Sequence, residues 1–96
     1  MQYLLIHTRR IDVYSHRGNS YNNLGEYQKA IADYNEAIRL DSQHANAYYG
    51  RGNSYGKIGD KQTAIQNFQQ VADLYQQQGN TGYWYQKALD RIRELQ

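Results

Sequence analysis

The apolar residues of the chain recur at helical spacing in two successive stripes. Steps of three and four residues place each stripe on one face of a helix, so the pattern predicts two helices and an all-α fold. The first stripe is Tyr14, Gly18, Tyr21 and Leu24, and the second is Tyr27, Ala30, Ile31, Tyr34, Ala37 and Ile38.

A glycine separates the two stripes. At Gly25 a left-handed backbone conformation would end the first helix and let the chain reverse within a few residues. A turn this short makes the two helices antiparallel. The pattern therefore predicts a helical hairpin.

The hairpin pattern occurs twice. Residues 11–44 align without a gap to residues 45–78, and the pentapeptide RGNSY at 17–21 returns at 51–55. A fixed period of this length indicates stacked supersecondary units. The identical pairs are Tyr14/Tyr48, Arg17/Arg51, Gly18/Gly52, Asn19/Asn53, Ser20/Ser54, Tyr21/Tyr55, Gly25/Gly59, Gln28/Gln62, Ala30/Ala64, Ile31/Ile65, Leu40/Leu74 and Gln43/Gln77.

Gly18 and Gly52 fall in the middle of the first helix of each unit. A glycine there costs about 1 kcal/mol relative to alanine. Because the cost recurs at one register, we expect two backbones to approach closely, with Ala30 and Ala64 as the small partners on the second helix.

Each unit resembles a tetratricopeptide repeat, a 34-residue helical hairpin. The resemblance covers residues 11–78, and the Arg-Gly pair resembles a bacterial variant of the repeat. It implies an α-solenoid of two helix-turn-helix repeats that mediates protein–protein interaction. The matching positions are Tyr14, Gly18, Tyr21, Ala30, Tyr34 and Ala37, and then Tyr48, Gly52, Tyr55, Ala64, Phe68 and Val71.

The chain departs from the family pattern at two positions. Arg17 and Arg51 replace the usual leucine, so their charged heads must reach solvent or a partner. The proline that helps to stop the second helix is replaced by Ser42 and Gln76.

A final helix is expected after the second repeat, with Asn80 or Thr81 as its N-cap. We interpret it as a capping helix whose charged residues Lys87, Arg91, Arg93 and Glu94 keep the outer face wet. Its apolar stripe is Tyr85, Ala88, Leu89, Ile92 and Leu95. The predicted single domain comprises an extension at 1–10, repeats at 11–44 and 45–78, and the capping helix at 79–96.

The extension leaves alternatives open. Leu4, Leu5 and Ile6 are apolar enough to lie against the first repeat, so the segment can extend the first helix or be the remnant of an upstream one. A partly ordered tail is the other reading.

Composition excludes several classes of function. The net charge of +2 is spread along the chain without the basic patch that nucleic-acid binding requires. No apolar run is long enough for a membrane span or a signal peptide, so the default location is the cytoplasm. The chain has no cysteine, which excludes disulfides and thiolate chemistry.

No catalytic constellation is present. His7, His16 and His44 lie in separate segments without a metal-binding spacing, and no serine has a nucleophile-elbow context. A phosphate-binding loop is also missing. We predict a non-enzymatic protein without a metal or cofactor.

The resemblance implies that the first helix of each repeat lines a concave groove. The corresponding positions share a mostly polar helical face, opposite the packed stripe. Those taken as candidate peptide contacts are Asp12, Ser15, Asn19, Asn46, Tyr49, Asn53 and Lys57, with Gly56 beside them. For Asn19 and Asn53 a peptide-clamping role and a capping or inter-helix role remain open, whereas Asn22 and Asn23 are expected only to solvate the surface.

Trp84 is a candidate interface anchor, with packing over the end of the preceding helix as the alternative. Relatives that bind carboxylate-ended chaperone tails use lysine and asparagine positions that hold Ser15, Asn19 and Gly50 here. That clamp is therefore absent.

The leading hypothesis is an interaction module that holds a peptide or partner helix in its groove. The alternative is a self-assembly unit that oligomerises or exchanges units between chains through its end faces, since stacked repeats usually need three or more units. Single-stranded nucleic-acid binding lacks the basic stripe that it would need.

Overall fold

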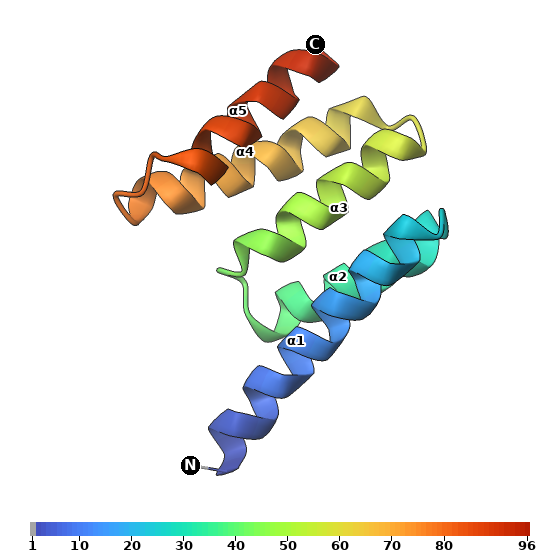
Figure 1. Ribbon diagram of the computed structural model, residues 1–96, viewed down its shortest axis with the longest axis vertical. Coiled ribbons are helices and arrows are strands. Elements are labelled where there is room, and N and C mark those ends of the chain that lie inside the picture. The colour runs from blue at the N-terminus through green and yellow to red at the C-terminus, as the bar shows by residue number, and fades with distance from the viewer. Residues whose placement is uncertain (1) are drawn as a thin grey trace.

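The computed structural model describes the backbone of residues 2–96 and the side chains of residues 5–96. Within that range the chain forms five helices in two antiparallel hairpins plus a last helix (Figure 1). The predicted all-α repeat fold is thereby confirmed. The helices are α1 (Gln2–Asn23), α2 (Tyr27–Leu40), α3 (Ala45–Lys57), α4 (Lys61–Gln77) and α5 (Tyr83–Leu95).

Glycines end the helices as the sequence predicts. Gly25 and Gly59 have positive φ angles of 79° and 90°, and Gly79 repeats the feature after α4 with 70°. In each turn the next residue donates its backbone N–H to a carbonyl five residues back, for example Glu26 to Tyr21 at 2.8 Å. This bond satisfies a helix-terminal carbonyl and closes the reversal.

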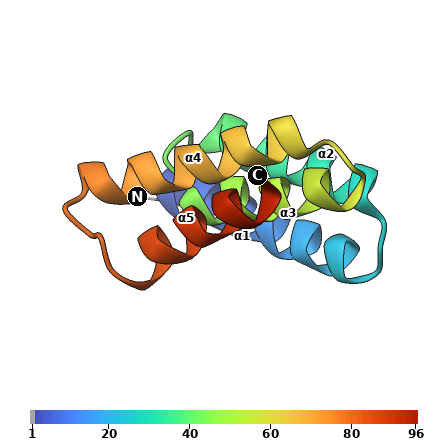
Figure 2. The same cartoon turned by 90° about the horizontal axis from the view of Figure 1, so that it is seen from above.

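The helices make a slab of 44 × 34 × 18 Å, about two helices thick. Seen from above, α2 and α4 lie along one side of the slab and α1 and α5 along the other (Figure 2). Helix α3 packs against α1, α2 and α4 and so joins the two hairpins.

Tyr34 of α2 fills the joint between the hairpins. Its ring is 1% exposed and packs with Ala30, Ala37 and Ala47. A Cβ added at Gly18 of α1 would lie 2.9 Å from the ring, and one added at Gly50 of α3 would overlap it. Two helices thus approach the ring closely because both have a glycine there.

The expected partners of the helix-centre glycines are therefore wrong. Gly52 faces Phe68, whose ring would be 3.0 Å from an added Cβ, just as Gly18 faces Tyr34. An aromatic ring, and not Ala30 or Ala64, occupies the space that the missing side chain leaves. Phe68 is fully buried in the second hairpin.

The N-terminal segment extends the first helix, which was one of the three alternatives. Leu5 and Ile6 are nevertheless 62% and 57% exposed, so the expected packing of these two residues is wrong. One contact with the repeat is polar, since His7 Nε2 lies 3.0 Å from the Leu40 carbonyl oxygen. Met1 and the side chain of Leu4 lie outside the described residues.

The other helix ends are set without proline. Helix α2 ends at Leu40, and the Asp41 carboxylate accepts the backbone N–H of Gln43 at 3.0 Å. Helix α5 has Gly82 as its N-cap, so the expectation of Asn80 or Thr81 there is wrong. Asn80 contributes from outside the helix, accepting the Gly82 N–H at 3.4 Å.

Candidate functional site: an asparagine-lined groove

A groove of about 360 Å³ crosses the helices on the α1 and α5 side of α3. Five asparagines of α1 and α3 line it, together with two aromatic residues, the buried Tyr34 and a glycine. The lining residues are Asn19, Asn22, Asn23, Tyr34, Asn46, Tyr49, Gly50, Asn53 and Trp84.

The structure brings most of the candidate residues together. Asn19, Asn46, Tyr49, Asn53 and Trp84 all line the groove.

Three candidates lie elsewhere. Asp12 and Lys57 are exposed but do not line the groove. Ser15 is only 5% exposed, and its hydroxyl lies 2.9 Å from His44 Nε2 at the α2–α3 joint. Because Ser15 is buried and bonded, it is not available to a ligand in this structure.

The side-chain oxygens of three groove asparagines are already occupied by donors of the protein. Asn19 Oδ1 accepts the Tyr34 hydroxyl proton, and Asn53 Oδ1 accepts from Arg91 at 3.0 Å. Arginine has no acceptor, so Asn53 must present its oxygen to it and turn its NH₂ group away. The structure thus places both asparagines in inter-helix bonds, the second of the two roles left open.

Asn22 makes the third such bond, which the sequence reasoning missed. Its Oδ1 accepts from the hydroxyl of Ser54 at 2.9 Å, so it links α1 to α3 and does more than solvate the surface. No signal in the repeat period pairs these residues, since they stand 32 positions apart and at different points of the repeat.

The occupied oxygens give the groove a donor-rich character. Among the described residues, none accepts a hydrogen bond from the NH₂ groups of Asn19 and Asn53, whereas the Asn22 amide bonds to the Tyr34 hydroxyl. Each amide has two N–H donors. The groove therefore offers donors to groups that present oxygen acceptors.

Two aromatic rings close one end of the groove. Tyr49 packs edge-on against Trp84, with ring centres 5.6 Å apart, and against Phe68 at 5.2 Å. Trp84 keeps 44% of its surface exposed, and its ring contacts are with Tyr49 of α3 and with the neighbouring Tyr83. Burial raises the pKa of Tyr49, so its hydroxyl stays neutral at ordinary pH.

Arg91 and its ion-pair partner Glu94 lie close to Tyr49. The Arg91 guanidinium lies 5.2 Å from the centre of the Phe68 ring and pairs with Glu94 at 2.8 Å. The expectation that Arg91 faces outward is wrong, because Phe68 and Asn53 hold it between α5 and α3. Nearby, Lys87 Nζ lies 5.7 Å from the centre of the Tyr83 ring.

Tyr34 forms the floor of the groove. Burial of its side chain raises the pKa of Tyr34 to about 12. The hydroxyl therefore keeps its proton well above neutral pH and continues to donate to Asn19.

The two arginines of the repeated pentapeptide also find partners. Arg17 pairs with Asp33, and Arg51 bonds to the amide oxygens of Asn67 and Asn35. All of these bonds join helices, so the arginines replace the family's leucine with polar links.

Comparison with family models gives two overlapping matches. Residues 18–59 match a model described as TPR repeat, and residues 46–77 match one described as Tetratricopeptide repeat. A search of curated proteins gives no significant match. In the part of the chain that the structure describes, no helix is long and apolar enough to cross a membrane.

Proposed function

This chain belongs to the tetratricopeptide repeat family, and on that premise we propose that its asparagine-lined groove binds an extended peptide segment of a partner protein. Repeats of this family generally mediate protein–protein interaction, and its members are typically not enzymes. The proposal concerns where the partner binds and which chemistry recognises it.

The observation that carries the proposal is the common orientation of the groove amides. Asn19 and Asn53 each use their oxygen inside the protein and keep their N–H groups for a ligand. An extended backbone presents carbonyl oxygens at regular intervals and leaves them free when it is outside a sheet. A row of amide donors fits that backbone whatever its side chains are.

The aromatic end supports one side-chain contact. Trp84 is held by Tyr49 yet remains partly exposed, and tryptophan in such a setting is a frequent hot spot of binding energy. Lys87 nearby, which forms no ion pair with the described residues, favours an acidic residue at this point of the peptide.

Selection from a random library of linear peptides tests the proposal, because the partner is unidentified. We expect peptides to be enriched on the wild-type protein and to lose at least tenfold in affinity against Asn46→Ala and Trp84→Ala. Asn46 is exposed and has no side-chain bond among the described residues, so its replacement leaves the fold intact.

The matched control is Gln62→Ala, an exposed change on α4 away from the groove. Peptides that bind the control and the wild type equally but fail on the groove variants support the proposal. Peptides whose affinity is unchanged by both groove variants would overturn it.

A second candidate function is self-association, which the apolar residues of α1 favour. Leu5, Ile6 and Val13 are all more than half exposed, at the end of the stack where a further repeat would pack. Exposed apolar patches often mark interfaces.

Light scattering over a wide concentration range tests this candidate. A mass that rises with concentration and returns to the monomer value in Val13→Glu supports it. A constant monomer mass would exclude it and leave the groove proposal untouched.

A further inference from the structure

We propose that Arg51 forms a binding site for an oxyanion, a carboxylate or phosphate group supplied by a ligand. The proposal rests on a difference between the repeats. Arg17 and Arg51 occupy the same place in the same pentapeptide but meet different groups on the second helix of their repeat.

In the first repeat the arginine is neutralised within the protein. Arg17 Nε and Nη2 donate to the two carboxylate oxygens of Asp33 at 2.8 and 2.7 Å. The Asp33 side chain is 7% exposed, so its charge needs a partner. This bidentate pair raises the pKa of Arg17 and leaves no unbalanced charge.

In the second repeat the carboxylate is replaced by an amide. Arg51 Nε donates to Asn67 Oδ1 at 2.7 Å, and Nη1 donates to Asn35 Oδ1 at 2.9 Å. Both acceptors are neutral, and no carboxylate of the described residues forms an ion pair with Arg51. Of the five guanidinium donors, three remain without an acceptor in the described part of the chain, both of those on Nη2 included.

The guanidinium is also held in place. Asn67 cannot rotate its oxygen away, because its NH₂ group donates to the Thr63 carbonyl at 2.8 Å. The guanidinium carbon lies 5.3 Å from the centre of the Tyr48 ring, and the Tyr48 hydroxyl is tied to the Ser42 carbonyl at 3.0 Å. A fixed cation loses little entropy when it binds an anion.

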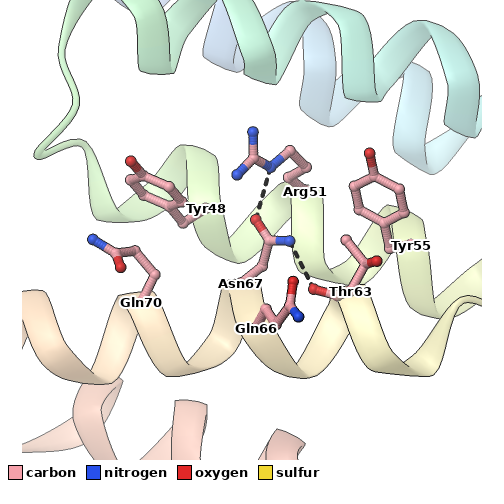
Figure 3. Close-up of a pocket in the computed structure, with 7 residues that line it drawn as sticks. All are labelled: Tyr48, Arg51, Tyr55, Thr63, Gln66, Asn67 and Gln70. Carbon is pink, nitrogen blue, oxygen red and sulfur yellow. Dashed lines mark hydrogen bonds between the residues drawn. The ribbon is translucent and has the colours of Figure 1, made fainter.

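Arg51 opens into a pocket of about 410 Å³ between α3 and α4 (Figure 3). No acidic residue contributes to the lining, so the pocket contains one positive charge and no negative one. Tyr48 and Tyr55 stand on either side of Arg51, and glutamine amides add further donors (Figure 3). The lining residues are Tyr48, Arg51, Tyr55, Thr63, Gln66, Asn67 and Gln70.

The pocket is separate from the peptide groove. Tyr48, Arg51 and Tyr55 recur at helical spacing on one face of α3, whereas Asn46, Tyr49 and Asn53 lie on the other. Both sites can therefore be occupied and tested independently. An oxyanion here would balance the charge of Arg51, as Asp33 balances the charge of Arg17 in the first repeat.

Titration followed by the Nε–H resonances of the two arginines tests the proposal. Sodium acetate and sodium phosphate are added in separate experiments at constant ionic strength, with chloride as the compensating anion. We expect a saturable shift of the Arg51 resonance and a much smaller, linear shift of Arg17, which serves as the control within the same molecule. Saturation by acetate alone identifies a carboxylate site, and saturation by both probes or by phosphate alone extends it to phosphate groups.

Asn67→Asp is the matched variant, because it gives the second repeat the carboxylate of the first. We expect it to abolish the saturable shift while the helical circular dichroism signal is unchanged. Arg51→Gln is a second variant, whose glutamine resonances should not respond to either probe. Equal linear shifts of Arg17 and Arg51 in the wild type, or a saturable shift that persists in Asn67→Asp, would overturn the proposal.

Discussion

The two repeats share a pentapeptide but surround it with different chemistry. In the first, Arg17 meets a carboxylate and Gly18 meets Tyr34, whose hydroxyl bonds to Asn19. In the second, the equivalent residues meet an amide and a phenylalanine, and Asn53 takes its donor from Arg91 of the last helix.

This difference shows which helix of the repeat varies in chemistry. The first helix has the same pentapeptide in both repeats. The second helix differs in charge, with Asp33 in the first repeat and Asn67 in the second, and in polarity, with Tyr34 and Phe68 at the next position. The first repeat is therefore electrostatically closed, and the second leaves Arg51 open to a ligand. A repeat can conserve its fold through one helix and change its surface chemistry through the other.

Removing either central ring should produce the largest effect. Tyr34→Ala and Phe68→Ala each delete a side chain that is 1% exposed or less, so each should lower the free energy of unfolding by about 3–5 kcal/mol. Urea denaturation followed by circular dichroism measures the loss. A loss below about 1 kcal/mol for either variant would show that its ring does not hold the hairpin.

High pH should have the second-largest effect on stability, and this effect should depend on Tyr34 and not on Phe68. The pKa of Tyr34 is about 12, above its unfolded value of about 10, so the folded state favours the protonated hydroxyl. Its contribution is complete below about pH 10 and is lost as the pH rises to 12, about 2–3 kcal/mol in all.

Urea denaturation across this range should show a smaller fall in stability for Tyr34→Phe than for the wild type. Phe68 has no ionisable group, so Phe68→Leu serves as the control and should keep the wild-type pH dependence. Parallel profiles for Tyr34→Phe and the wild type would contradict the assignment.

Replacing Gly50 with alanine should have the third-largest effect on stability. The added methyl group would overlap the Tyr34 ring, whereas at Gly56 on the same helix the nearest atom is 3.9 Å away. Both substitutions gain helix propensity, so the difference between them isolates the clash, about 1–3 kcal/mol. Thermal melts of the two variants measure it, and equal melting temperatures would refute the close approach.

The smallest effect should come from the helix caps. Asp60 accepts the Thr63 N–H at 3.2 Å in the second repeat, whereas its counterpart Glu26 makes no side-chain cap bond. Asp60→Ala should therefore cost about 1 kcal/mol. Glu26→Ala, the control, should cost a few tenths at most, and a larger loss for Glu26→Ala than for Asp60→Ala would reverse the comparison.

The repeat period was sufficient to predict the helices and their turns. Gly25 and Gly59 end helices because only the conformation they favour lets the chain reverse, and that requirement is local to the sequence. The low helix propensity of glycine was enough to predict a close approach at Gly18, but not to identify Tyr34 as the residue that approaches. Tyr34 reaches it through side-chain length, which spacing along the chain does not encode.

Contacts between repeats were the least predictable part of the site. Asn22 bonds to Ser54, and Arg91 bonds to Asn53, because the second hairpin and α5 stack at a particular offset. No residue type or spacing in the sequence predicts that offset. The family positions did locate Asn19, Asn46, Tyr49 and Asn53 in one groove. They misplaced Ser15, since His44 of the next joint covers it.

A spectrum of the protein with a library-selected peptide tests the central claim most directly, that the asparagine groove is where a partner binds. We predict that the largest chemical-shift changes fall on the Trp84 indole N–H and the Asn46 side-chain amide, with Arg51 and Val13 little affected. Changes concentrated around Arg51 or Val13, with Trp84 and Asn46 unmoved, would contradict the account.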